Sequence, residues 1–382
     1  GRPAAPAAGP ARPSVTELRL SAFKSHRGAA FRMGAVTLFA GASGSGKSQV
    51  MEAYEALARL GSGAALADVF PDPEACVPDR AAPDAQGRRG FRIGCTVDGP
   101  AGPVRLDLAV QADPELRIVG ERLTAGAQTL LTTALRDPGR RSVQAAWFTG
   151  GAVGVTRAPL PDDRLGTALL PLRVAGSTAG QRQVLDAAEQ LVVALRSVFP
   201  CDPQPRRMRE PVPAGTGRLR SGCDNLAEVL RRTRHECTTR HAALVEAARR
   251  GCTGPVLALD AETLPDGRIR AVLGRDGAAD GTPLGRLADG ELRFLALALV
   301  LLTGPGVLAV DPAAELLPAR QALTVLADGL DHRLDHRQTG ELLRLALASC
   351  ARGHIRLAGT VGAAGAALAR GVPGVSVVDL VA

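Results

Sequence analysis

Near the start of the chain, the pattern of apolar and polar positions predicts two strands and a helix. Residues 15–23 (VTELRLSAF) alternate as a half-buried strand does, and residues 35–40 (AVTLFA) form the short apolar run of a buried strand. A glycine-rich stretch follows, and between residues 47 and 60 apolar side chains recur at helical spacing. The predicted order is therefore strand, glycine-rich loop, helix.

The middle of the chain has two further patterns. Segments at 90–99, 103–111 and 115–123 alternate in the same way and are joined by turn residues, which predicts successive antiparallel strands. Residues 179–199 and 223–250 have the periodicity of amphipathic helices, and a proline-rich connector separates them. We expect an antiparallel β subdomain followed by a short helical insert.

The last third alternates strand-like and helix-like segments. In chain order we expect strands at 255–261 and 268–274, a helix at 289–303, a strand at 306–311, helices near 318–330 and 338–350, a strand at 354–360, a helix at 362–370 and a strand at 374–381. Such alternation is typical of an α/β fold with a mostly parallel sheet. We therefore expect an α/β protein.

These patterns also suggest a division of the chain. Proline, alanine and glycine dominate residues 1–13, which we expect to be a disordered tail. An N-terminal lobe at 14–175 would hold the glycine-rich loop and the β subdomain. The helical insert would occupy 176–250, and a C-terminal lobe would occupy 251–382.

Composition adds limits on partners and location. The chain has 382 residues, 46% of them hydrophobic, which is enough for a large core. Its net charge of +8 permits an anionic partner, but aromatic residues make up only 3%, so base stacking and hence nucleic-acid binding gain no support. Seven scattered cysteines without a C-x-x-C pair, and no secretory signal, predict a cytoplasmic protein. We expect no membrane span, because no apolar run reaches about 18 residues.

The glycine-rich loop carries the most specific chemistry. Lysine is rare, since only Lys24 and Lys47 occur among 46 basic residues, and Lys47 lies in GASGSGKS, which matches the pattern G-x-x-x-x-G-K-[ST]. In that pattern glycines turn backbone N–H groups toward a phosphate, the lysine contacts the β- and γ-phosphates, and the serine, here Ser48, binds Mg²⁺. The candidate ATP-binding residues are Gly41, Ala42, Ser43, Gly44, Ser45, Gly46, Lys47 and Ser48, with Gln49 at the edge.

Three further segments accompany this loop: LRLSAFKSHRG at 18–28, GCDNLAEVL at 222–230 and LADGELRFLA at 287–296. Together they resemble the ABC-type P-loop ATPases of the RecF, SMC and OLD type, and most of all their short-armed predicted ATPases. The resemblance runs from about residue 15 to the C-terminus.

The resemblance implies an α/β head that forms a homodimer around ATP, or acts with a partner protein, in a DNA-related or defence process. It places Asp289 and Gly290 of one subunit over the γ-phosphate bound to the other subunit's Lys47. The serine that usually precedes them is Ala288 here. The resemblance also implies that Lys24 approaches the nucleotide.

Two parts of the family pattern are altered. The late strand of the family ends in two carboxylates, whereas VLAVDPAAELLP at 307–318 offers Asp311. One alignment makes Asp311 the general base, and an alignment with a one-residue gap makes it the Mg²⁺ residue, so it is a candidate for both roles. The switch histidine is replaced by Val361.

We therefore expect an ATP hydrolase, with Lys47 and Asp311 as catalytic residues, that binds ATP and Mg²⁺ and hydrolyses slowly. Loss of a positioned acid–base group lowers rates by roughly 10²–10⁴-fold. The alternative is a nucleotide-sensing module with little or no hydrolysis. A small-molecule kinase would use the same loop, but the segment at 287–293 argues against it.

Overall fold

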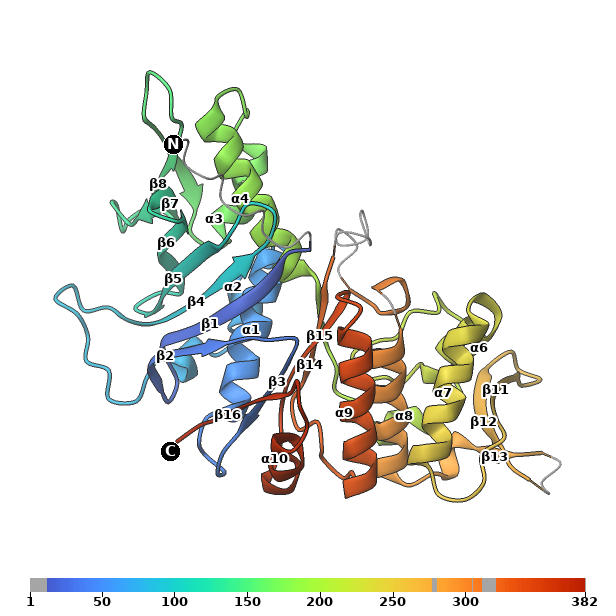
Figure 1. Cartoon of the computed structure of the whole chain (residues 1–382). Helices are drawn as coiled ribbons and strands as arrows, with labels where there is room; N and C mark the ends of the chain where they lie inside the picture. Colours follow the sequence, from blue (N-terminus) through green and yellow to red (C-terminus); the bar gives the residue numbers. More distant parts are fainter. Residues whose placement is uncertain (1–11, 277–279, 304, 311–320, 382) are drawn as a thin grey trace, which may run out of the picture. The chain divides into compact units, whose positions relative to one another are not determined.

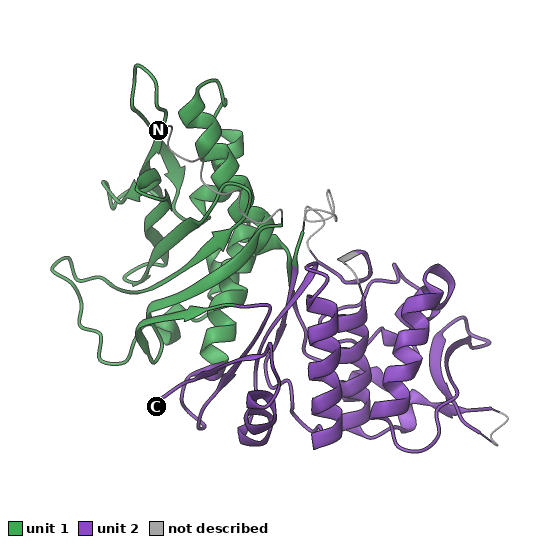
Figure 2. Ribbon diagram, in the orientation of Figure 1, with its two compact units in different colours: residues 1–33, 48–198, 311–322 green, residues 34–47, 199–310, 323–382 purple. Residues whose placement is uncertain are grey.

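The chain, shown as a computed structural model in Figure 1, divides into two compact units (Figure 2). The structure describes residues 12–276, 280–303, 305–310 and 321–381. Unit 1 is assembled from residues 1–33, 48–198 and 311–322, and unit 2 from residues 34–47, 199–310 and 323–382, as far as these are described. Each unit therefore combines segments that are far apart in the sequence.

Unit 1 contains an eight-stranded sheet with the order β2-β1-β4-β5-β6-β7-β8-β9. Each pair of neighbours is antiparallel. The strands are β1 (Ser14–Phe23), β2 (His26–Arg32), β4 (Arg89–Asp98), β5 (Val104–Asp113), β6 (Arg117–Ala125), β7 (Gln128–Ala134), β8 (Ser142–Phe148) and β9 (Val155–Pro161). The antiparallel strands predicted at 90–99, 103–111 and 115–123 are confirmed as β4, β5 and β6.

Two long helices belong to this unit: α1 (Lys47–Gly61), of which only the first residue, Lys47, is assigned to unit 2, and α4 (Ala179–Arg196). Helix α4 packs on the sheet through β1, β4, β5, β7 and β8. At Gly61 an added Cβ would lie 2.5 Å from Leu195 Cβ, so only glycine allows α1 to approach α4 so closely. The short elements are α2 (Leu66–Val69), η1 (Pro73–Cys76), α3 (Gly166–Leu169) and η2 (Leu170–Leu172).

Unit 2 contains a five-stranded sheet with the order β10-β14-β15-β3-β16. The strands are β3 (Val36–Ala40), β10 (Val198–Pro200), β14 (Leu323–Ala327), β15 (Ile355–Thr360) and β16 (Ser376–Asp379). Strands β14, β15, β3 and β16 run parallel. All residues of β3 and β14 are buried, as in parallel strands that are covered on both faces.

Two predictions for the C-terminal third are wrong. The helix expected near 318–330 is replaced by strand β14 in its described part. The strand expected at 306–311 is not formed by residues 306–310, which hold the end of the turn η4 (Pro305–Val307) and an isolated bridge from Leu308 to Leu219. Asp311 lies outside the described residues.

The helices of unit 2 are α5 (Pro205–Met208), α6 (Leu226–Glu236), α7 (Thr238–Gly251), α8 (Asp289–Leu302), α9 (His336–Cys350) and α10 (Ala363–Arg370). Helix α9 packs on β15 and β3, α10 packs on β3 and β16, and α7, α8 and α9 pack against one another. A small sheet of β11 (Ala258–Thr263), β12 (Ile269–Gly274) and β13 (Thr282–Pro283), followed by η3 (Leu284–Arg286), adjoins α6. The four-part division expected from the sequence stays a prediction. Within the described residues, every helix is too short or too polar to cross a membrane.

Candidate phosphate-binding site

The glycine-rich loop leaves the carboxyl end of β3 and ends at Lys47, where α1 begins, so the predicted strand–loop–helix order is confirmed. Gly44 and Gly46 have φ angles of 82° and 87°, in the left-handed region that glycine adopts without steric cost. At Gly41 an added Cβ would lie 2.6 Å from Ser45 Oγ and 2.7 Å from the Leu380 carbonyl oxygen. The tight course of the loop therefore depends on its glycines.

The side chain of Lys47 lies over this loop. Its Nζ donates hydrogen bonds to the carbonyl oxygens of Gly41, at 2.9 Å, and Val361, at 3.3 Å. Both oxygens belong to residues that directly follow parallel strands, β3 and β15. Because a phosphate oxygen is charged, it is a stronger acceptor for an ammonium group than a neutral carbonyl. The half-buried Lys47 ammonium is therefore suited to receive an anion.

Ser45 contributes an unsatisfied polar group. Its hydroxyl is buried, the residue is only 5% exposed, and Ser45 Oγ has no hydrogen-bond partner among the described residues. A buried hydroxyl without a partner costs about 1–3 kcal/mol. An oxygen-rich ligand in the loop could supply the missing partner. The glycine conformations, the lysine and this hydroxyl together fit a bound phosphate group.

The two residues after Lys47 are the next residues of α1. Ser48 is exposed, and its role as a Mg²⁺ ligand stays a prediction. Gln49 Oε1 accepts hydrogen bonds from the backbone N–H of Ser25, at 3.1 Å, and from Ser25 Oγ, at 2.6 Å. Gln49 therefore fixes the turn between β1 and β2 to the first turn of α1.

An aspartate that the sequence reasoning missed lies at the edge of the parallel sheet where the loop begins. Asp328 follows the last residue of β14, and the strand registers bring the carboxyl ends of β14, β15 and β3 to one edge. Asp328 Oδ1 accepts a hydrogen bond of 2.6 Å from Thr360 Oγ1, which itself accepts one of 2.7 Å from the N–H of Gly329. Ligands of α/β folds bind at this edge.

The positions beside Asp328 and Thr360 have no titratable side chain. Gly329 follows Asp328 and has φ of 66°, a left-handed conformation. Val361 follows Thr360, is 2% exposed, and donates its backbone N–H to the Phe39 carbonyl oxygen at 3.0 Å. Neither side chain can accept or donate a proton. A run of apolar residues ending in aspartate, LTVLAD at 323–328, was the signal that could have revealed this edge.

Asp289 and Gly290 lie at the start of α8, as predicted. The Asp289 carboxylate accepts a hydrogen bond of 2.5 Å from Arg209 and lies 3.7 Å from the Arg333 guanidinium. The Arg209 guanidinium lowers the pKa of Asp289 below its usual range. At Gly290 an added Cβ would lie 2.3 Å from the Arg333 carbonyl oxygen, so glycine is required by a close backbone approach.

The first turn of α8 also carries Glu291. Its carboxylate accepts hydrogen bonds from the backbone N–H groups of Ala288, at 3.2 Å, and Thr253, at 2.9 Å. Both acidic side chains of this turn are therefore engaged, Asp289 by arginine and Glu291 by backbone. Helix N-termini favour anions. The pairing of Asp289 with Arg209 reduces the repulsion that an approaching phosphate would meet.

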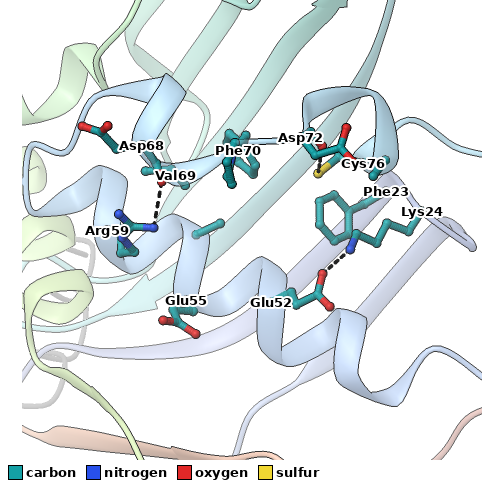
Figure 3. A pocket seen from close by; sticks show the side chains of 13 residues that line it. Phe23, Lys24, Glu52, Glu55, Arg59, Asp68, Val69, Phe70, Asp72 and Cys76 are labelled. Atoms are coloured by element: carbon teal, nitrogen blue, oxygen red, sulfur yellow. Dashed lines mark hydrogen bonds and ion pairs between the residues drawn. The ribbon is translucent and has the colours of Figure 1, made fainter. Parts of the chain in front are cut away.

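Lys24 occupies a different environment, a pocket of about 370 Å³ in unit 1 (Figure 3). Its Nζ forms an ion pair with Glu52, and its backbone N–H donates to the Cys76 carbonyl oxygen at 2.9 Å. Phe23 and Phe70 provide apolar walls. The approach of Lys24 to a nucleotide stays a prediction, and the ammonium already has a carboxylate partner.

No protein-family model and no curated protein matches the sequence. Among solved structures, the fold is similar to an Smc head bound to the C-terminal winged-helix domain of ScpA, with 13% identity over 91% of this chain and 90% of that chain and a TM-score of 0.47. A second is the Smc head domain with an extended coiled coil bound to the C-terminal domain of ScpA from Pyrococcus furiosus, with 11% identity, 93% and 92% coverage and a TM-score of 0.48. A third is the SMC head domain from Thermotoga maritima, with 14% identity, 91% and 89% coverage and a TM-score of 0.36.

Proposed function

We propose that the chain is an ABC-type nucleotide-binding protein that binds ATP with Mg²⁺ through residues 41–48 and hydrolyses it slowly. The proposal rests mainly on one observation. A loop with two left-handed glycines follows a parallel strand and holds Lys47, and in the contacts described above the Lys47 ammonium has only neutral carbonyl oxygens as hydrogen-bond acceptors. The buried Ser45 hydroxyl without a partner among the described residues supports it.

We assign the Mg²⁺-associated carboxylate of this site to Asp328, whereas the sequence suggested Asp311. Support comes from the strand order, because β14 is separated from β3 only by β15 and Asp328 directly follows β14. P-loop NTPases hold Mg²⁺ through the serine of the loop and an aspartate at the end of a neighbouring strand. Asp328 would be this aspartate, Ser48 is the loop serine expected from the sequence pattern, and Mg²⁺ would neutralise phosphate charge.

Slow hydrolysis follows from the neighbours of Asp328 and Thr360. The family that the sequence resembles has a second carboxylate after the first and a histidine after the next strand, where this chain has Gly329 and Val361. Each missing acid–base group lowers the rate by roughly 10²–10⁴-fold. The same two residues favour a second candidate function, a nucleotide-sensing module in which turnover is incidental.

Nucleotide-dependent association of two chains is the part of the proposal that rests on the first turn of α8, which holds Asp289 and Gly290 and which we call the signature turn. Asp289 is paired with Arg209, so the charge at the start of α8 is partly compensated. This compensation would allow the backbone N–H groups of that turn to meet a phosphate bound to another copy. A DNA-related or defence process remains a part of the family resemblance, and it requires its own test.

The first experiment measures binding of ATP with and without Mg²⁺ by isothermal titration calorimetry. Lys47→Ala should weaken binding at least tenfold, equivalent to about 1.4 kcal/mol. Lys24→Ala removes the only other lysine and is the comparison: because the Lys24 ammonium is already paired with Glu52, we expect an unchanged affinity, whereas a weaker affinity would support the approach of Lys24 to the nucleotide. Asp328→Asn should remove the contribution of Mg²⁺ to the affinity, whereas Asp311→Asn should not. Equal affinities for wild type and Lys47→Ala would refute the proposed site.

A second experiment separates slow hydrolysis from sensing. Phosphate release by the purified protein should stay below about one turnover per second. Light scattering after size exclusion, with and without ATP and with and without DNA, reports association. The sensing module would be favoured if wild type forms ATP-dependent dimers but releases phosphate no faster than the Asp328→Asn variant. Faster turnover than this limit would contradict the interpretation of Gly329 and Val361.

A further inference from the structure

Two buried cysteines of unit 2 are in contact. The Sγ atoms of Cys201 and Cys223 lie 4.0 Å apart, and the residues are 3% and 0% exposed. In the described part of the chain the other five cysteines show no such sulfur contact, and no third histidine, cysteine, aspartate or glutamate joins the pair to complete a metal-binding group. The pair is therefore better suited to react with itself than to hold a metal.

The backbone around the two cysteines is paired. The N–H of Asp202 donates to the Ser221 carbonyl oxygen at 2.9 Å, and the N–H of Gln204 donates to that of Gly222 at 3.0 Å. Cys223 has φ of 58°, a conformation that costs a residue with a Cβ roughly 1–2 kcal/mol. The two ends of the connector 202–222 are thus held side by side, next to the two cysteines whose sulfurs are in contact.

This connector contacts the start and the first turns of α8. Arg209 donates hydrogen bonds to the carbonyl oxygens of Gly285, at 2.7 Å, and Leu287, at 2.6 Å, as well as to Asp289. The Pro203 carbonyl oxygen accepts a hydrogen bond of 3.1 Å from Arg293. A covalent bond between the two ends of the connector would therefore restrict the motion of residues 202–222. Arg209, which bonds to the signature turn, lies in this segment.

We propose that Cys201 and Cys223 form a reversible disulfide that closes the base of the connector. With a peroxide as the oxidant, one thiolate attacks a peroxide oxygen, the O–O bond breaks, and a sulfenic acid and water form. The second sulfur then attacks the sulfenic sulfur, the S–S bond forms and a second water leaves. Two thiols are oxidised and one hydrogen peroxide is reduced to two waters.

The surroundings determine the rate of this reaction. The contact with Cys201, and burial after it, raise the pKa of the Cys223 thiol, so little thiolate is present at neutral pH. Both sulfurs are nearly inaccessible to solvent, which favours a small oxidant over a bulky disulfide. We expect oxidation by hydrogen peroxide to be slow and to accelerate as the pH rises, because the thiolate is the nucleophile.

The test treats the full chain with hydrogen peroxide, then counts thiols in denaturant and maps tryptic peptides. The thiol count should fall from seven to five, and peptides 197–206 and 221–231 should appear linked. Dithiothreitol should restore seven thiols. Brief trypsin treatment of the folded protein should cleave the connector several-fold more slowly after oxidation.

Cys201→Ala and Cys223→Ala should each abolish the linked peptides and the change in proteolysis. Cys252→Ala is the matched control, because Cys252 is also buried in unit 2 but has no sulfur neighbour, and it should still show the loss of two thiols. Seven thiols after oxidation of the wild type, or a link between other cysteines, would overturn the proposal. Because these measurements involve no nucleotide, they are independent of the proposed function.

Discussion

Replacement of Arg293 by methionine tests how α8 is tied to the edge of the sheet. Arg293 is 5% exposed and donates hydrogen bonds to the carbonyl oxygens of Gly329, at 3.0 Å, His332, at 3.1 Å, and Pro203, at 3.1 Å. Asp202, a carboxylate near its guanidinium, is 3.9 Å away and has a side chain that is 69% exposed. Arg293 therefore acts mainly through hydrogen bonds to backbone carbonyl groups, including that of Gly329, the residue directly after Asp328.

The size of the effect follows from these bonds. A hydrogen bond with a charged partner contributes about 1.5–3 kcal/mol, so three would contribute about 4.5–9 kcal/mol if they were additive. Removal of the cation also removes the cost of burying it, which offsets part of this sum. We expect Arg293→Met to lower the free energy of unfolding by about 3 kcal/mol. Arg293→Lys should lower it at least as much, because one ammonium cannot reproduce the planar fork of a guanidinium.

Urea unfolding followed by far-UV circular dichroism measures this change. Trp147, the only tryptophan, lies in β8 of unit 1, so its fluorescence reports the unfolding of that unit separately. The Arg293 variants should shift the circular-dichroism transition. An Arg293→Lys protein within about 0.5 kcal/mol of wild type, the usual range of a neutral surface substitution, would refute the role given to the fork.

Three further predictions concern other positions. Gly290→Ala should lower the melting temperature in thermal unfolding and weaken ATP-dependent association, because its Cβ would lie 2.3 Å from the Arg333 carbonyl oxygen; a stable variant would show that this backbone can move. Gly329→Glu alone should not raise phosphate release, because the histidine of the family pattern is still missing at Val361; it should cost roughly 1–2 kcal/mol of stability in urea unfolding, because the position has a left-handed φ. Burial raises the pKa of Glu121 above its ordinary 4.5, although the hydroxyl and backbone N–H of Thr167 and the backbone N–H of Gly166 donate hydrogen bonds to its carboxylate. Its contribution to stability is therefore present at low pH and is lost as the pH rises through the raised pKa. The melting temperature of wild type minus that of Glu121→Gln should decrease as the pH rises through that range. A difference that stays constant with pH would contradict the raised pKa.

The elements predicted best are those whose local pattern and tertiary role agree. The run at 35–40 and the helix from residue 47 correspond to β3 and α1, because a loop of this type requires a buried strand before it and a helix after it. The expected helix at 289–303 is α8, since its acidic first turn and apolar continuation satisfy a helix in any context. Local signals were sufficient in these cases.

Strand β14 shows where local signals fail. Its residues, LTVLA, are all buried, and a short apolar run has the same pattern in a buried strand as in a buried helix. The competing segment GVLAV at 306–310 has an equally strand-like composition, yet it contributes an isolated bridge to Leu219. Only the pairing of Leu323–Ala327 with β15 distinguishes the two, and pairing is a property of the folded sheet. The two candidates for the Mg²⁺-associated carboxylate, Asp311 expected from the sequence and Asp328 in our proposal, reflect this ambiguity.

In the proposed function, ATP binding can persist without efficient ATP hydrolysis because the two processes require different kinds of groups. The loop at 41–48 uses backbone conformation, one ammonium and one buried hydroxyl, and none of these depends on the side chains at positions 329 and 361. Hydrolysis needs a positioned acid–base side chain, and a glycine and a valine supply none. Substitutions at positions 329 and 361 can therefore accumulate without loss of the groups that would bind phosphate in the loop at 41–48. Under the proposed function, the chain responds to the presence of ATP, which Lys47 and Asp328 would contact, more than to its cleavage.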